Sequence, residues 1–205
     1  MATNQSHWEK VYQTKGYDAV SWYAPHLSES LRLIAELCPR KDAAIVDIGG
    51  GESTLVDDLL AQGYTDLSVL DISVTAIDFT RRRLGARASR VNWCVGDITQ
   101  YDFKGKTFDL WHDRAVFHFL TDADKRAAYT NLVKASVKRG GYVVMATFGP
   151  EGPLKCSGLD VVRYDPEKLH GEFGDKFRLM GSQTNQHATP FGTTQQFLYC
   201  WCKVA

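Results

Sequence analysis

The sequence predicts an α/β protein built on an open, mostly parallel sheet. Apolar runs of strand type alternate with stretches of helical periodicity between residues 44 and 148. Three consecutive glycines separate the first of these strands from the helix that follows it. Near the end of the chain, two strand-like segments have no room for a helix between them. They must pair through a hairpin-like connection, so the last strand is expected to be antiparallel.

Length, charge and cysteine content limit what the chain can be. Its 205 residues suit one α/β domain, which we divide into segments 1–43, 44–148 and 149–205. Lys plus Arg and Asp plus Glu both total 24, so the net charge is zero and we expect no nucleic acid partner. There is no signal-like N-terminus and no apolar run of membrane-spanning length, so we expect no membrane contact. The five cysteines lack Cys-x-x-Cys spacing, which favours a reducing cytoplasm over a disulfide framework or a zinc site.

The first segment combines aromatic residues with one predicted helix. Aromatic side chains gather at His7-Trp8 with Tyr12 and at Tyr17 with Trp22-Tyr23. After Pro25, leucine and isoleucine recur at helical spacing until the chain reaches Pro39, which predicts a helix against one face of the sheet. The aromatic part either folds over a ligand mouth or fills the edge of the core.

The central feature is the stretch from Ala44 to Ser53. A strand of apolar residues carries Asp47 near its end, and Gly49, Gly50 and Gly51 then lead into a helix that begins near Leu55. A turn without Cβ atoms allows the backbone to approach a ligand closely, and open α/β sheets bind ligands at the carboxyl ends of their strands. A dinucleotide fingerprint would require a third small residue where Thr54 stands. A turn that only reverses the chain is the other interpretation of this stretch.

A second acidic residue follows at the end of the next predicted strand, over residues 66–71. Asp71 lies 22 residues beyond the first glycine, at the position from which an acid accepts hydrogen bonds from a ribose diol. Ser73 is placed to cap the following helix, which ends at Gly85. Because Ser73 is available as the cap, Asp71 is left free for a ligand.

The third and fourth strands are predicted over residues 91–95 and 107–112. The third leads to Asp97, which is placed to accept a hydrogen bond from an exocyclic amine such as that of adenine, and to Ile98, which adds an apolar contact. The next helix opens at Thr121 with a capping-box spacing to Asp124 and ends at residues 140–141. A fifth strand follows over residues 142–148.

The remainder of the chain departs from this alternation. Residues 149–174 are rich in Gly and Pro, and long loops in compact domains are often functional. We expect Cys156, Arg163 and Tyr164 of this loop to contact a substrate, with Arg163 suited to a carboxylate or phosphate. The last two strands are expected at 177–180 and 196–204.

These motifs together resemble the class I S-adenosylmethionine-dependent methyltransferases over residues 40–150. The resemblance implies a doubly wound, mostly parallel seven-stranded sheet of order 3-2-1-4-5-7-6, with helices on both faces and the last strand antiparallel. It implies S-adenosylmethionine as cofactor, S-adenosylhomocysteine as product, and a cofactor-binding core at 44–148 between a helical cap segment and an acceptor-side C-terminal segment. Ser53 stands where many members have a further glycine. The implied cofactor-binding residues are Trp22, Asp47, Gly49, Gly50, Gly51, Asp71, Ile72, Asp97, Ile98 and Asp113.

The N-terminal segment adds a narrower resemblance. Residues 7–12 with 20–23 are similar to the start of protein-lysine methyltransferases that modify elongation factor or citrate synthase. The residues from Asp113 to His118 differ from those found at the same place in that group. We therefore expect a small-molecule acceptor, with protein-lysine N-methylation as the alternative.

Methyl transfer from a sulfonium is an in-line displacement that needs alignment and exclusion of water, and it needs a base only for a protonated acceptor. The candidate bases are His112, Asp113 and His118, of which His118 lies among apolar residues that also suit a core histidine. Asp113 is also placed to orient the cofactor's ammonium group. We expect no metal and a monomer or homodimer. A nicotinamide-dependent Rossmann protein and a non-catalytic S-adenosylmethionine-binding protein remain rival interpretations.

Overall fold

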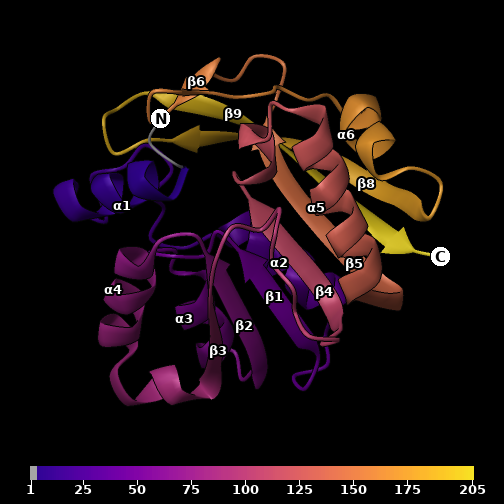
Figure 1. Ribbon diagram of the computed structural model, residues 1–205, viewed down its shortest axis with the longest axis horizontal. Coiled ribbons are helices and arrows are strands. Elements are labelled where there is room, and N and C mark those ends of the chain that lie inside the picture. Colours follow the sequence, from indigo (N-terminus) through magenta and orange to yellow (C-terminus); the bar gives the residue numbers. More distant parts are fainter. Residues whose placement is uncertain (1–3) are drawn as a thin grey trace.

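A single seven-stranded sheet forms the centre of the molecule in the computed structural model, which describes residues 4–205 (Figure 1). Its order is β3-β2-β1-β4-β5-β9-β8, and β9 runs antiparallel to both β5 and β8. The strands are β1 (Ala44–Ile48), β2 (Asp66–Asp71), β3 (Val91–Val95), β4 (Phe108–Arg114), β5 (Val137–Phe148), β8 (Phe177–Ala188) and β9 (Thr194–Val204). Two further strands, β6 (Lys155–Cys156) and β7 (Leu159–Asp160), form a separate hairpin. The predicted order is therefore confirmed, because β8 and β9 are the sixth and seventh strands of the sheet.

Helices cover both faces of the sheet, as predicted. They are α1 (Asn4–Thr14), α2 (Ser28–Leu37), α3 (Leu55–Ala61), α4 (Val74–Leu84), α5 (Ala123–Ser136) and α6 (Pro166–Phe173). Apolar side chains of α2, α3 and α4 form one core against the sheet, and those of α5 and α6 form a second core on the opposite face. Within residues 4–205, every helix is too short or too polar to cross a lipid bilayer.

The helix boundaries follow local capping chemistry. Ser73 caps α4, because its Oγ accepts a hydrogen bond from Ala76 N at 3.2 Å, and Gly85 ends the helix with a φ of +57°. The predicted cap of α5 at Thr121 is wrong by one residue. The carboxylate of Asp122 accepts hydrogen bonds from the amides of Asp124 and Lys125 instead.

Strand β8 and helix α5 differ most from their predicted bounds. Strand β8 runs to Ala188 rather than ending at Met180, and it pairs with β9 along its whole length. Its outer half is mostly polar and exposed at the sheet edge, so it lacks the apolar alternation that predicts a strand. Helix α5 ends at Ser136, before the predicted Gly140, because the chain enters β5 at Val137.

Helix α1 was not predicted, and it lies beside the N-terminal end of α4 (Figure 1). Glu9 Oε1 accepts a hydrogen bond from Val74 N at 2.6 Å, and Gln5 Nε2 donates to the carbonyl of Ile72 at 3.2 Å. A carboxylate at a helix N-terminus is stabilised by the unpaired amides and by the helix dipole. These polar contacts hold α1 across the carboxyl ends of β1 and β2.

Candidate functional site

Two adjoining cavities open at the carboxyl ends of the central strands. The larger, here called the main cavity, encloses about 800 Å³ including space open to solvent. The smaller, called the turn cavity, encloses about 510 Å³ on the same terms. The main cavity is lined by Trp8, Tyr12, Trp22, Ile48, Gly49, Leu70, Asp71, Ile72, Gly96, Asp97, Ile98, Arg114, Ala115, Val116, Phe119, Leu120 and Cys156.

The turn cavity is lined by Gly49 and Gly50 of the glycine turn. Five of its residues also line the main cavity, so the two spaces adjoin along a shared wall. The shared residues are Tyr12, Trp22, Ile48, Gly49 and Arg114; the others are Tyr17, Val20, Tyr23, Ala24, Leu27, Asp47, Gly50, Glu52, Ser53, Thr54 and His112.

The three glycines are required by close packing around the turn. A Cβ atom on Gly50 would lie 2.4 Å from Asp47 Oδ2, and one on Gly51 would lie 2.6 Å from Asp71 Oδ2. Gly49 has a φ of +68°, and its Cβ would lie 2.1 Å from Val116 Cγ2. All three distances are shorter than real Cβ atoms allow. The turn therefore does more than reverse the chain, because it brings backbone against the two acids that line the site.

Asp47 is held by a buried network that leaves one of its oxygens available. His112 Nδ1 lies 2.7 Å from Asp47 Oδ1, and His112 Nε2 lies 2.8 Å from Ser30 Oγ. An ionised carboxylate can only accept hydrogen bonds, so this pairing assigns the proton to Nδ1. Asp47 Oδ2 is buried without a hydrogen-bond partner among the described residues. A buried oxygen of this kind is costly unless a ligand donates to it.

Asp71 is fixed from its own strand end and from the glycine turn. Its Oδ2 accepts a hydrogen bond from Gly51 N at 3.0 Å and its Oδ1 accepts one from Ser73 N at 2.8 Å. Burial raises the pKa of Asp71 to about 6, although these two hydrogen bonds lower it. Each carboxylate oxygen retains a second lone pair for a ligand hydroxyl.

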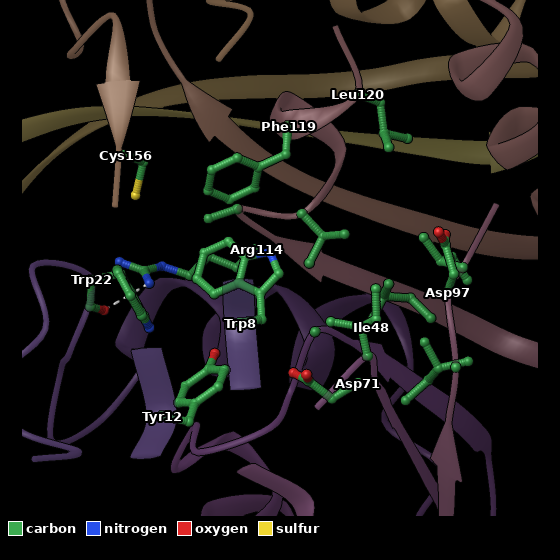
Figure 2. A pocket seen from close by; sticks show the side chains of 17 residues that line it. Trp8, Tyr12, Trp22, Ile48, Asp71, Asp97, Arg114, Phe119, Leu120 and Cys156 are labelled. Atoms are coloured by element: carbon green, nitrogen blue, oxygen red, sulfur yellow. Dashed lines mark hydrogen bonds between the residues drawn. The ribbon is translucent and has the colours of Figure 1, made fainter. Parts of the chain in front are cut away.

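The third strand end supplies the far side of the main cavity. Asp97 and the buried Ile98 line it together with Ile72 and Asp71, as the sequence predicts (Figure 2). Asp97 Oδ1 accepts hydrogen bonds from the amide and the hydroxyl of Thr99 at 2.9 and 2.7 Å, which holds the carboxylate at the mouth of the cavity.

Glu52 is a member of the site that the sequence analysis did not single out. It lines the turn cavity, is only 9% exposed, and its Oε2 has no hydrogen-bond partner among the described residues. Burial raises the pKa of Glu52 to about 7, with Arg83 lowering it and Asp71 raising it. Its position directly after Gly51 was the sequence signal that could have identified it as a site residue.

Aromatic residues of the N-terminal segment, together with Phe119, form one wall of the main cavity. Trp8 contacts Trp22 and Phe119 edge to face, with ring centroids 5.8 and 5.1 Å apart. Tyr12 of α1 reaches the same space (Figure 2). The N-terminal aromatic segment thus forms a wall over the ligand mouth, which favours the first of its two predicted roles.

The post-β4 segment differs from the prediction at two residues. Asp113 does not line either cavity. Its carboxylate accepts hydrogen bonds from Val116 N, Phe117 N and Tyr129 Oη, so it braces the turn after β4 rather than orienting a ligand. His118 is fully buried, and its Nδ1 accepts a hydrogen bond from Phe148 N at 3.2 Å. Burial and Arg114 lower the pKa of His118 to about 3, which makes it a neutral core histidine.

The loop after β5 brings one of its three predicted residues to the site. Cys156, in the β6–β7 hairpin, lines the main cavity, and burial raises the pKa of its thiol to about 11. Arg163 lines neither cavity and donates to the carbonyl of Gly152 at 3.2 Å. Tyr164 is fully buried against Phe117 in the α5–α6 core. The expected substrate contacts of Arg163 and Tyr164 are therefore corrected, because the loop directs both away from the cavities.

Within residues 4–205, no cluster of three or more His, Cys, Asp or Glu side chains is arranged to hold a metal ion. A metal-independent reaction remains a prediction.

Comparisons with known proteins agree with this geometry. Residues 45–141 match a family model described as a methyltransferase domain. The eEF1A lysine and N-terminal methyltransferase of Mus musculus is 32% identical over 120 residues, which are 58% of this chain and 17% of that protein. The chain thus spans about a sixth of the length of this relative. The predicted similarity to the elongation-factor lysine methyltransferases is confirmed by such relatives.

Two solved structures share the fold. A SAM-dependent methyltransferase from Anabaena variabilis superimposes with a TM-score of 0.76 at 13% identity, covering 100% of this chain and 96% of that one. The 1,6-didemethyltoxoflavin-N1-methyltransferase of Burkholderia thailandensis, solved with S-adenosylhomocysteine, gives a TM-score of 0.70 at 17% identity, covering 98% and 87%. With its matching domain, strand order and relatives, the chain is similar to the class I, seven-stranded methyltransferases.

Proposed function

We propose that the protein transfers a methyl group from S-adenosylmethionine to a small-molecule acceptor in the main cavity. The observation that carries the proposal is the buried, unpartnered Oδ2 of Asp47 beside a glycine turn, with Asp71 at the end of the next strand. The two acids line two different but adjoining cavities beside the turn. This separation suits a ligand that has a cationic amino-acid end and a ribose.

The residues present fit such a cofactor. Asp47 and Glu52, each with one buried carboxylate oxygen that lacks a partner, would hold the ammonium group in the turn cavity. Asp71 would accept hydrogen bonds from the ribose hydroxyls, and Asp97 with Ile72 and Ile98 would surround the adenine. When bound, S-adenosylmethionine supplies an electrophilic methyl group, whose bond to sulfur breaks with the electron pair remaining on sulfur as the acceptor's lone pair forms the new bond.

The acceptor side supports a small molecule. The aromatic wall of Trp8, Trp22 and Phe119 with the buried Cys156 narrows the cavity opposite the acids. Aromatic side chains on one side of a cavity help to align a small acceptor and to displace water from it. We assign no general base, because His112 is engaged by Asp47 and Ser30, and His118 and Asp113 lie outside the cavities.

The alternative acceptor is a protein amine, since the mouse relative is described as a lysine and N-terminal methyltransferase. We also propose that the protein acts in a reducing cytoplasm as a monomer or homodimer. Its five free cysteines, four of them buried, are consistent with that compartment.

The test is calorimetry with S-adenosylhomocysteine in the presence of a chelator. We expect saturable binding well below millimolar concentration, with NADH unable to compete. Absence of S-adenosylhomocysteine binding at millimolar concentration would refute the proposed function, and binding of NADH alone would support a nicotinamide enzyme. A screen of thiols, amines, carboxylates and lysine-bearing proteins with methyl-labelled cofactor would then distinguish the two acceptor classes and a non-catalytic binding protein.

A further inference from the structure

Arg114 places a cation at the junction of the two cavities. It is the last residue of β4 and is half-buried. One guanidinium nitrogen, Nη1, donates to the backbone carbonyl of Trp22 at 3.0 Å, and the guanidinium carbon lies 4.3 Å from the centre of the Phe197 ring. Figure 2 shows the guanidinium beside Trp22, with Cys156 above it and its sulfur directed into the cavity.

No acid neutralises this charge within the described part of the chain. Among residues 4–205, Arg114 forms no ion pair within 4.0 Å, whereas Arg83 forms one with Asp57 at 2.6 Å. Three titratable groups near Arg114, those of His118, His187 and Cys156, are uncharged at neutral pH. Burial, followed by Arg114 itself, lowers the pKa values of His118 and His187, and burial raises that of the Cys156 thiol to about 11.

The half-buried guanidinium of Arg114 donates a single hydrogen bond within the described residues, so most of its N–H donors have no protein partner. Arginine carries five N–H donors in a fork that matches the two oxygens of a carboxylate. A desolvated charge is costly unless a counter-ion or hydrogen-bond acceptors compensate for it. Because Arg114 lines a cavity, the missing partner can come from a ligand.

We propose that Arg114 binds a carboxylate group of the methyl acceptor, so that the substrates of this protein are carboxylate-bearing small molecules. The inference rests on the proposed function and narrows its substrate class. It replaces Arg163, which the sequence favoured for the same chemistry, by an arginine that lies at the site.

The carboxylate has two possible sources, because a cofactor with an amino-acid end also carries one. The surroundings of the guanidinium favour the acceptor. Its contacts come from Trp22 and from Phe197 of β9, next to the hairpin that carries Cys156, rather than from the glycine turn. The acids Asp47 and Glu52 mark the turn cavity as the place for a cationic group instead.

The bound carboxylate serves recognition and is not the methylated atom. A guanidinium that donates to the carboxylate oxygens stabilises their negative charge, which makes them weaker nucleophiles toward a methyl group. The reacting atom is therefore a separate nucleophile on the acceptor, beside the aromatic wall of Trp8 and Phe119. A lysine ammonium in the same space would be repelled by Arg114, which disfavours a protein-lysine acceptor.

The experiment measures binding of matched acid and amide probes in the presence of saturating S-adenosylhomocysteine. The pairs are butyrate and butyramide, phenylacetate and phenylacetamide, and indole-3-acetate and indole-3-acetamide. Wild type should bind at least one acid about tenfold or more tightly than its amide. Arg114→Gln should remove this preference, and Arg114→Lys, which keeps the charge, should restore part of it. Arg163→Gln is the matched control and should behave like wild type.

A second arm identifies the source of the carboxylate. S-adenosylhomocysteine and 5′-methylthioadenosine, which lacks the amino-acid end, are titrated into wild type and Arg114→Gln. Unchanged affinity for both ligands, together with loss of the acid preference, supports the proposal. A loss of about tenfold for S-adenosylhomocysteine alone would assign Arg114 to the cofactor and overturn the proposal. Equal binding of acids and amides by a wild-type protein that binds S-adenosylhomocysteine would also overturn it, while leaving the proposed function intact.

Discussion

His112 and Asp47 lie directly opposite each other in the pairing of β4 with β1, and their side chains are joined by the 2.7 Å contact of Nδ1 with Oδ1. The strand register therefore sets the orientation of the carboxylate and directs Oδ2 toward the glycine turn, where a Cβ on Gly50 would meet it. Ser30 of α2 completes the arrangement by holding the second ring nitrogen. His112 is thus a positioning residue for Asp47.

A double-mutant cycle tests this relationship. His112→Leu should lower the free energy of unfolding by about 1–3 kcal/mol, because it removes the buried partner of Asp47 Oδ1 and one of the two partners of Ser30 Oγ. It should also weaken S-adenosylhomocysteine binding about tenfold. Combined with Asp47→Asn, the two changes should show a coupling energy of at least about 1 kcal/mol in urea denaturation. A coupling energy near zero would contradict a positioning role.

Asp71→Ala should weaken S-adenosylhomocysteine binding by about 2–4 kcal/mol, because it removes a charge-assisted contact. It should also lower stability, since Gly51 N and Ser73 N lose their acceptor. Asp71→Asn should be milder on both counts because it keeps one acceptor oxygen. Calorimetry and urea denaturation on the same samples separate the two effects. Wild-type affinity in two folded variants would show that Asp71 does not bind the cofactor.

The raised pKa of Glu52 predicts that wild type and Glu52→Gln differ in stability by an amount that depends on pH. Its folded-state pKa of about 7 is above the ordinary value of 4.5, so the folded state holds the proton more tightly than the unfolded state. The stability linked to this proton is fully present below pH 4.5 and is lost as the pH rises through 7. Glu52→Gln should therefore match wild type near pH 5 and exceed it by about 1–3 kcal/mol at pH 8.5, in the absence of ligand.

The matched control for Glu52 is Glu167→Gln, at an exposed position in the first turn of α6. Urea denaturation at pH 5, 7 and 8.5 should give the control a stability difference that varies little with pH. A Glu52→Gln difference that is likewise independent of pH would show that Glu52 titrates normally in the folded protein.

The contact of Glu9 with α4 should control how long a ligand stays bound. Glu9→Ala removes the acceptor for the amides of Val74 and Thr75, which loosens α1 and the wall that Trp8 and Tyr12 form. We expect S-adenosylhomocysteine to dissociate about three to ten times faster, an energy of about 0.6–1.4 kcal/mol. Stopped-flow fluorescence measures this rate, and hydrogen exchange should show less protection in α1. Lys10→Ala, on the exposed face of the same helix, should change neither.

The strand order and the acids that line the two cavities could be predicted from the sequence because their signals are local. Asp47, Asp71 and Asp97 each follow an apolar strand, and parallel strands bring their carboxyl ends to one edge. The bounds of the helix after Asp71 could also be predicted, because Ser73 and Gly85 mark its two ends in the sequence.

The acceptor side could not be predicted in the same way, because it depends on contacts between distant segments. Arg114 reaches the site only when the fold brings its side chain against Trp22 of the N-terminal segment and Phe197 of β9. Arg163 had the better local context, a long glycine-rich loop, yet the loop turns it toward Gly152. The structural role of Asp113 could not be predicted for the same reason. The three groups that donate hydrogen bonds to its carboxylate come together only when the turn after β4 has folded.

The hairpin of β6 and β7 has a consequence for how such a protein diversifies. It contributes Cys156 to the cavity, yet its two strands pair only with each other and lie outside the hydrogen-bond register of the seven-stranded sheet. Insertions, deletions or substitutions in residues 155–160 can therefore accumulate without shifting Asp47 or Asp71 at the strand ends. If the protein transfers methyl groups as proposed, changes confined to this hairpin can alter the acceptor while the residues proposed to bind the methyl donor stay the same.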